Sequence, residues 1–281
     1  MMDALAQMAV WLSAFANALS KPLMGVYAAM PGWLSCTLVS AGMGLAMLVA
    51  FKYTSNQAAI RRVRDDIKAN LLAVKLFPDS IVVTLRAQGR LLRGAVMLLV
   101  LAVAPMLVMI VPMSLLLGQM GLWYQSRPLR AGEETVVTVT LAGASGSARP
   151  DVKLAPTSAA EVLVGPVRIV SQNQVCWSLR ARENGYHRLA FMVDGQTVEK
   201  ELTVGDALMR VSVERPEWNW SAILLNPAEP PLGRASAVRA IRIDYPDREA
   251  GVSGADWWVA YCFAASMVFA LCFRAFIKVN L

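Results

Sequence analysis

The sequence has very few of the side chains on which enzymes most often rely. It contains one histidine, His187, and four cysteines among 281 residues. It has no nucleophile–histidine motif, phosphate-binding loop or C-x-x-C pair. Asp65 and Asp66 are adjacent and lie among arginines, which is typical of a solvated helix face. We therefore expect no enzymatic activity, no metal site and no cofactor.

Cysteine is especially scarce in the region 124–255, where Cys176 stands alone. A lone cysteine cannot form an intradomain disulfide, so this region must fold on its hydrophobic core. The alternating pattern around Cys176 predicts a buried strand residue rather than a reactive thiol.

Charge is missing from three stretches, Trp33–Phe51, Gly94–Ser126 and Trp257–Phe273. The whole chain is 56% hydrophobic, above the roughly 45–50% of soluble domains. At about 1.5 Å per residue, the first stretch makes roughly 28 Å of helix, close to a hydrocarbon core of about 30 Å. The sequence predicts three transmembrane helices. The alternative for each is a buried helix of a soluble protein.

The basic residues are concentrated in one short segment. Lys52–Arg93 carries nine Lys and Arg against three Asp, whereas the segment before Trp33 has only Lys21. The positive-inside rule then places this segment and the C-terminus in the cytoplasm and the N-terminus outside, across a bacterial inner membrane. A basic loop beside a membrane contacts anionic lipid, so we predict lipid contacts and no specific nucleic-acid binding.

The N-terminal segment has apolar residues at helical spacing: Leu5, Met8, Leu12, Phe15 and Leu19. Polar residues interrupt its other side, which favours a helix lying in the membrane interface. The alternative is a fourth membrane span that ends at Lys21 and Pro22.

The basic segment predicts a helical hairpin. Thr54 or Ser55 can cap its first helix, Pro78 ends that helix, and Asp79 or Ser80 can cap the return helix. An apolar seam recurs at steps of three and four residues: Ile60, Val63, Ile67, Leu71 and Val74. Four basic residues form a candidate capture surface on the remaining faces: Arg61, Arg62, Arg64 and Lys68. The alternative is a purely structural coiled coil.

Alternating apolar runs separated by turn residues fill the region 124–255. They predict about seven strands in an antiparallel, immunoglobulin-like β-sandwich. Asp194 and Gly195 are typical of a hairpin turn. Trp218 and Trp220, in a proline-rich stretch, form a candidate partner surface, and the alternative is a packed connection under the sandwich.

The order of these parts resembles the YidC/Oxa insertase superfamily. An interfacial helix, a span ending in "FKYTS", a basic hairpin and a second span with a "PMLVMIVP" core follow in order over residues 1–120. The similarity is greatest to the reduced three-span branch, which includes archaeal YidC-like proteins and the insertase-like subunit of the ER membrane complex. Here an extracytoplasmic β-domain is added.

The resemblance implies a hydrophilic groove that receives apolar segments of nascent membrane proteins, with the hairpin capturing clients or ribosomes. The first span lacks the groove arginine of bacterial members. Methionines suit varied apolar partners, although ordinary packing between spans is the alternative. The candidate groove residues are Met43, Met47, Lys52, Met106, Met109, Met113 and Gln119.

The fold class is therefore three transmembrane helices with a cytoplasmic antiparallel hairpin and a β-sandwich between spans two and three. The predicted order is an interfacial helix (1–31), a first span (32–52), a hairpin (53–93), a second span (94–120), a periplasmic sandwich (121–255), a third span (256–274) and a cytoplasmic tail (275–281). The expected function is insertase-like. The alternative is a structural or signalling subunit of a membrane complex, including a transporter or secretion complex, whose β-sandwich binds a partner.

Overall fold

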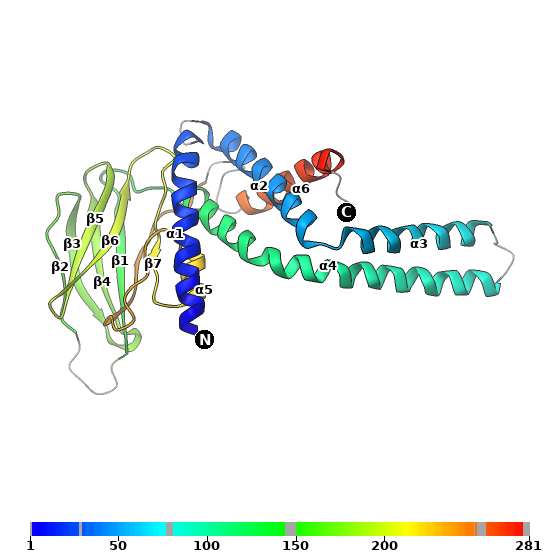
Figure 1. The fold of residues 1–281 in the computed structure, drawn as a ribbon. Coiled ribbons are helices and arrows are strands. Elements are labelled where there is room, and N and C mark those ends of the chain that lie inside the picture. Colours follow the sequence, from blue (N-terminus) through cyan, green and yellow to red (C-terminus); the bar gives the residue numbers. More distant parts are fainter. Residues whose placement is uncertain are drawn as a thin grey trace. The chain divides into compact units, whose positions relative to one another are not determined.

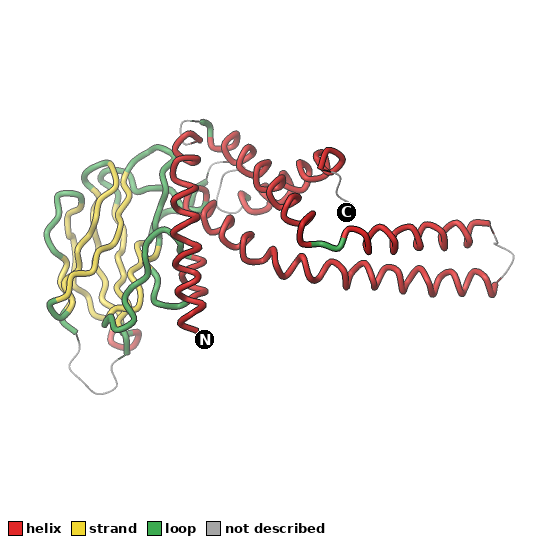
Figure 2. Tube along the Cα trace, viewed as in Figure 1, coloured by secondary structure: helices red, strands yellow, loops and turns green. Residues whose placement is uncertain are grey.

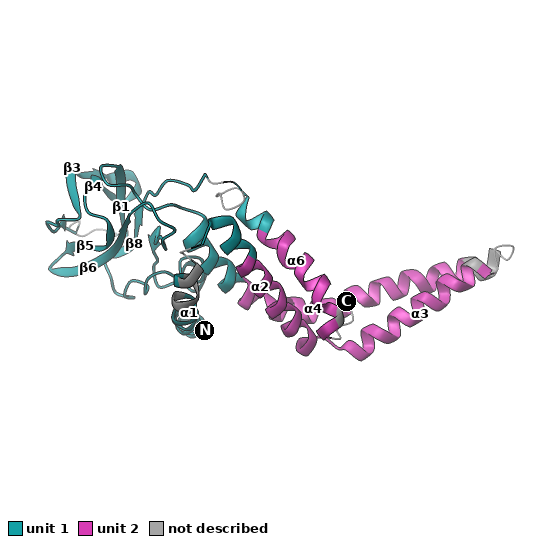
Figure 3. Ribbon diagram, turned by 90° about the horizontal axis from the view of Figure 1, so that it is seen from above, with its two compact units in different colours: residues 1–37, 114–261 teal, residues 38–113, 262–281 magenta. Residues whose placement is uncertain are grey.

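The structure, a computed structural model, is a mixture of helices and antiparallel sheets (Figures 1 and 2). It describes residues 2–27, 30–76, 81–143, 150–249, 251 and 257–277. The chain divides into two compact units, which Figure 3 colours separately. Unit 1 comprises residues 1–37 and 114–261, and unit 2 comprises residues 38–113 and 262–281.

The strands of unit 1 form two sheets. Five strands form one sheet in the order β3-β4-β1-β8-β7, and three form the other in the order β2-β5-β6. Neighbouring strands in both sheets run antiparallel. The strands are β1 Glu134–Leu141, β2 Val152–Leu154, β3 Ala160–Ile169, β4 Gln174–Ala181, β5 Gly185–Val193, β6 Gln196–Val204, β7 Glu214–Arg215 and β8 Val238–Ile243.

One hydrophobic core lies between the two sheets. Along β4 the alternating residues Val175, Trp177 and Leu179 are buried, and β5 buries Leu189 and Phe191 in the same cluster. The rings of Trp177 and Phe191 lie 5.5 Å apart between centroids. Period-two alternation therefore places one face of each sheet in a shared core, which confirms the predicted antiparallel sheets.

The strand predictions were right in most places and wrong in three. The turn at Asp194 and Gly195 is confirmed, because both residues have positive φ, 47° and 80°, as a two-residue hairpin requires. The alternating run "MRVSVERP" over 209–216, one of the seven runs predicted as strands, forms only the two-residue strand β7, and β2 was not predicted. Cys176 lies in β4 but is only half-buried, because the alternation that buries Val175 turns Cys176 outward.

Helix α1 (Met2–Tyr27) packs on the short helix α5 (Trp220–Leu225) in unit 1. Its inward face carries small residues, Ala6 and Ala9, which contact Ile223. Leu12 is half-buried. The other bulky apolar residues of the predicted helical spacing are exposed: Leu5, Met8, Phe15 and Leu19. The helix continues past Lys21 and Pro22, where the alternative of a fourth membrane span had its end, to Tyr27.

Within the part of the chain that the structure describes, two helices are long and apolar enough to cross a membrane. They are α2 (Gly32–Thr54) and the Leu85–Tyr124 part of α4 (Ile81–Tyr124). Helix α4 runs unbroken through Pro105 and Pro112, and many of its large apolar side chains between Leu85 and Val111 are exposed. The helix at the position of the third predicted span, α6 (Trp258–Ile277), has a shorter apolar stretch, Trp258–Arg274. Two candidate spans are thus present, and the third span remains a prediction.

Helix α3 (Gln57–Leu76) runs antiparallel beside the first part of α4, as Figures 1 and 3 show within unit 2. The predicted helical hairpin is therefore present. Its first helix is capped by Asn56, whose Oδ1 accepts from the Ala59 amide at 3.1 Å, and not by Thr54 or Ser55. Helix α2 extends through Thr54, which explains the difference. The predicted turn at Pro78, Asp79 and Ser80 lies outside the described residues.

The apolar seam of α3 differs from the prediction at one position. Ile60 is buried, and a Cβ at Gly94 of α4 would lie 2.6 Å from Cγ1 of Ile67, so α3 and α4 approach closely there. Leu71 is 62% exposed, whereas Asn70 is half-buried. The seam thus follows steps of three, four, three and four through Asn70, the regular heptad pattern.

We predict that Gly44→Ala weakens unit 2. A Cβ at Gly44 would clash with the backbone carbonyl oxygen of Ser266, so α2 and α6 would have to separate. Overpacking of this kind costs about 1–3 kcal/mol. The expected result is a lower unfolding temperature in detergent micelles.

Gly42→Ala is the matched control, because a Cβ at Gly42 meets nothing within 4 Å. Alanine is the better helix former, so this variant should be neutral or slightly stabilised. Equal unfolding temperatures for the two variants would contradict a tight α2–α6 contact at Gly44.

Candidate functional site

The candidate site is a pocket of about 680 Å³ within unit 2, lined by α2, α4 and α6. Helix α2 contributes Met43 and Met47, one helical turn apart. Helix α4 contributes Met106, Met109 and Met113, at spacings of three and four, which place them on one face. Met267 of α6 completes the set of methionines. Helical periodicity on separate helices thus gathers six methionines around one space.

The walls of this pocket are almost entirely apolar. Among its lining residues, only Ser266 has a polar side chain, and its hydroxyl donates to the Phe263 carbonyl within α6 at 3.0 Å. Phe51 and Phe263 are the aromatic residues of the lining. The pocket therefore differs from the hydrophilic groove that the family resemblance implied, and its walls suit an apolar occupant.

Five of the seven predicted groove residues line this pocket, and Lys52 and Gln119 do not. The Lys52 ammonium donates to the Ile277 carbonyl at 2.8 Å, at the end of α6. A cation at a helix C-terminus interacts favourably with the exposed carbonyls there. Lys52 thus connects the ends of α2 and α6 outside the pocket.

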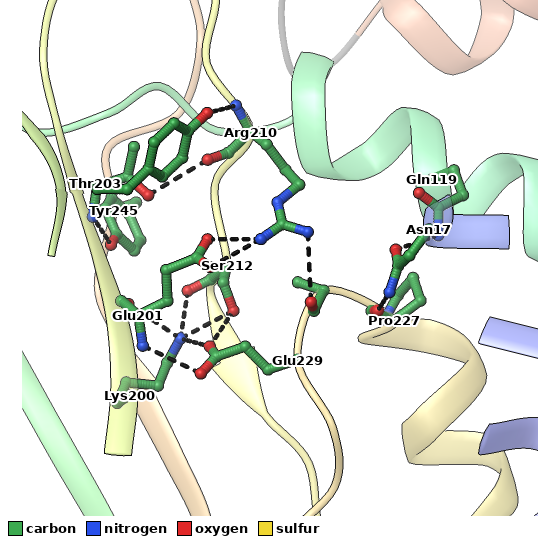
Figure 4. A network of polar contacts seen from close by, with 12 residues as sticks. Asn17, Gln119, Lys200, Glu201, Thr203, Arg210, Ser212, Pro227, Glu229 and Tyr245 are labelled. Atoms are coloured by element: carbon green, nitrogen blue, oxygen red, sulfur yellow. Dashed lines mark hydrogen bonds and ion pairs between the residues drawn. The ribbon is translucent and has the colours of Figure 1, made fainter. Parts of the chain in front are cut away.

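Gln119 is buried in unit 1, where it joins α4 to α1 (Figure 4). Its amide nitrogen donates to Asn17 at 2.8 Å, and its oxygen accepts from the Ser20 hydroxyl at 2.8 Å. Asn17 in turn donates to the Pro227 carbonyl at 2.6 Å. All of these groups find partners in one another, so Gln119 is a packing residue between helices rather than a groove residue.

The predicted capture surface is exposed at three of its four positions, Arg61, Arg62 and Lys68, and Arg64 is half-buried. Lys68 lies 3.9 Å from Asp65, and both side chains are largely solvent-exposed. Such an exposed pair adds little stability. The arginines therefore remain accessible to an anionic partner or to anionic lipid.

The two tryptophans of the predicted partner surface lie in different surroundings. Trp218 packs against the buried cluster of α1 and α5, and the Arg234 guanidinium lies 4.8 Å from its ring centre. Trp220, the first residue of α5, is exposed. Trp218 thus matches the alternative of a packed connection, because its ring packs against the cluster between α1 and α5. Of the two tryptophans, Trp220 is the one whose side chain is available to a partner.

A buried ion pair attaches the segment that follows α5 to strand β6 (Figure 4). Lys200 of β6 is fully buried and donates to Glu229 at 2.5 Å and to the Ser212 carbonyl at 2.6 Å. Glu229 also accepts from the Glu201 backbone amide at 3.0 Å. Burial lowers the pKa of the Lys200 ammonium, and the Glu229 carboxylate opposes that shift. The pair fixes residues 226–230 on the sheet.

Sequence reasoning missed this pair, although the strand pattern contains a sign of it. The inward positions of β6 are Val198, Lys200, Leu202 and Val204, so period two places a lysine toward the core. A lysine at such a position must be paired. Its partner, Glu229, lies 29 positions away in an irregular segment, so sequence alone could not identify it.

No protein family, curated protein or solved structure matches this chain. The resemblance to the YidC/Oxa superfamily is therefore untested and remains a prediction.

We predict that Glu229→Gln strongly destabilises the β-domain. The change leaves a buried ammonium without its counter-charge, and removing one partner of a buried ion pair typically costs about 3–5 kcal/mol. Chemical unfolding followed by the fluorescence of Trp177 and the other β-domain tryptophans would measure the loss.

Glu199→Gln is the control, because it removes the partner of Arg188 in a pair whose side chains are 77% and 49% exposed. An exposed pair contributes about 0–1 kcal/mol. Similar small losses in both variants would show that Lys200 is not a buried charge that depends on Glu229.

Proposed function

We propose that this protein is a non-enzymatic membrane protein that holds apolar segments of other membrane proteins while they insert, fold or assemble. The observation that carries the proposal is the methionine-lined pocket of α2, α4 and α6. Its volume of about 680 Å³ accommodates several apolar side chains of a client helix.

Methionine suits this task for a physical reason. Its unbranched thioether side chain adapts to irregular apolar surfaces, so one pocket can receive clients of different sequence. Inside a bilayer, lipid tails are as apolar as leucine, so helices associate through packing rather than through the hydrophobic effect. Client binding is then weak enough to be reversible, as a transient holder requires.

The charge distribution supports the proposed membrane setting. In this proposal α2, α4 and α6 cross a bacterial inner membrane, with the hairpin of α3 and α4 in the cytoplasm and an immunoglobulin-like β-sandwich outside. The exposed apolar side chains of α1, Leu5, Met8, Phe15 and Leu19, lie in the membrane interface on the outer side. Arg61, Arg62 and Lys68 are accessible for capturing nascent chains, ribosomes or anionic lipid on the cytoplasmic side.

The resemblance to the reduced YidC/Oxa branch supports a role in handling membrane proteins, but the pocket fits one part of that role better than the other. An apolar pocket can shield an apolar helix, but it cannot lower the cost of moving a charge through the bilayer, which amounts to several kcal/mol. The absence of a charged side chain from the described pocket lining favours holding and assembly over translocation of polar flanks.

The second candidate function is that of a structural subunit whose β-domain binds a partner in a membrane complex. The specific observation in its favour is the edge strand β3, where Val162, Val164 and Val167 are exposed. Exposed apolar residues on an edge strand are typical of a protein-interaction surface.

Site-specific photocrosslinking in native membranes tests the first function. A photoreactive residue at Met106 or Met109 faces the pocket, whereas one at Met97 or Val108 is exposed on the same helix and does not line the pocket. We expect crosslinks to many newly made membrane proteins from the pocket positions only, and their loss when protein synthesis stops.

Equal crosslinking from all four positions would indicate nonspecific contacts along the exposed surface of α4 rather than binding in the pocket. Crosslinks to a single stable protein, unchanged when synthesis stops, would favour the structural subunit.

A further inference from the structure

A second, polar pocket of about 470 Å³ lies in unit 1 where the chain leaves α4. Three segments line it: residues 127–130 after α4, 205–207 after β6, and 246–249 after β8. Backbone bonds join these segments. The Arg127 amide donates to the Pro246 carbonyl at 3.0 Å, and the Gly205 amide donates to the Leu129 carbonyl at 2.7 Å. The pocket therefore has a frame set by the backbone rather than by loose side chains.

Three arginines line the pocket, and two of them already have carboxylate partners. Arg127 makes two bonds of 2.8 Å to Glu133, and Arg130 lies 3.2 Å from Asp206. Arg248 has no carboxylate partner among the described residues. Its Nε is buried without a hydrogen-bond partner there, and its Nη2 reaches the Ser126 carbonyl only at 3.5 Å. Arg248 lines the pocket, and a guanidinium with unused donors is suited to an oxyanion such as a phosphate.

The same pocket also offers negative charge. Asp247 and Glu249 flank Arg248 in the sequence, line the pocket and are exposed. With Asp206, the lining has three acidic residues against three arginines. The balance does not favour a simple anion. It favours a ligand that carries a phosphate and a cation close together.

The position of the pocket indicates where such a ligand comes from. The Arg248 amide donates to the Gln125 carbonyl at 3.1 Å, directly after the last residue of α4, Tyr124. Tyr124 also ends the candidate span Leu85–Tyr124. If α4 crosses a bilayer, this pocket lies at the depth of the lipid headgroups.

We propose that this pocket binds a phosphate–ammonium headgroup, with the phosphate on Arg248 and the ammonium at Asp247 and Glu249. The headgroup of phosphatidylethanolamine has this chemistry. Its primary ammonium donates hydrogen bonds to carboxylates, as a trimethylated choline cannot. The site is separate from the methionine-lined pocket, and it does not depend on the client function.

The test uses the full-length protein purified in detergent and titrated with lipid, with bound lipid counted by native mass spectrometry. The lipids are phosphatidylethanolamine, phosphatidylcholine and phosphatidylglycerol, and soluble O-phosphoethanolamine is added in a separate titration. We expect the wild-type protein to retain phosphatidylethanolamine in preference to the other two lipids.

Arg248→Met should weaken that binding at least about tenfold, because it removes the charge-assisted bonds to the phosphate. Arg239→Met is the matched control, since Arg239 is an exposed arginine of β8 outside the pocket. The double change of Asp247→Asn and Glu249→Gln should keep phosphate binding but abolish the preference for phosphatidylethanolamine over phosphatidylglycerol. This variant retains Arg248, so it tests the site even if Arg248→Met fails to fold.

The outcomes separate the sources of the ligand. Binding of the lipid but not of O-phosphoethanolamine identifies a membrane headgroup. Equal binding of O-phosphoethanolamine supports the same ligand chemistry with a soluble source. Equal retention of all three lipids, or equal effects of the Arg248 and Arg239 variants, would overturn the proposal.

Discussion

The uncovered apolar surface of α4 is the constraint on which the rest of this structure depends. Leu99 is 69% exposed and Met106 66%. Each large apolar side chain left in water forgoes about 1.5–3 kcal/mol, while a whole domain is stable by only about 5–15 kcal/mol. Such a helix needs lipid or a partner around it. The basic hairpin at one end of α4 and the polar junction at its other end fit a bilayer.

The end of α4 in unit 1 is held by polar contacts as well as by buried apolar side chains, Met120, Leu122 and Trp123 among them. Asn17 and Gln119 connect α1 and α4 to the Pro227 carbonyl, and Lys200 secures Glu229 two residues later. The segment between these contacts therefore joins the helices to the sheets (Figure 4). Buried polar groups of this kind are costly when unpaired, so the junction tolerates few alternative arrangements. The flexible methionine pocket of unit 2 is the opposite case, since its contacts are adaptable and non-directional.

The elements with strong local patterns could be predicted from the sequence. Alternation identified six of the eight strands over most of their length, and helical spacing identified the hairpin and five pocket methionines. Three failures share one cause, which is a contact between residues far apart in the chain. Gln119 looked like a groove residue because its partners, Asn17 and Ser20, lie about 100 positions away. Lys200 and the short strand β2 depend in the same way on distant neighbours.

The most direct test of the central claim is to fill the methionine-lined pocket. Ala102 of α4 lines it, and Ala104 is exposed on the same helix and does not. In nanodiscs, energy transfer between a labelled single-span apolar peptide and labelled protein would report binding for Ala102→Phe, Ala104→Phe and the wild type. Our account predicts that Ala102→Phe weakens binding and Ala104→Phe leaves it unchanged. Equal binding by all three proteins would contradict the pocket as the place where apolar segments are held.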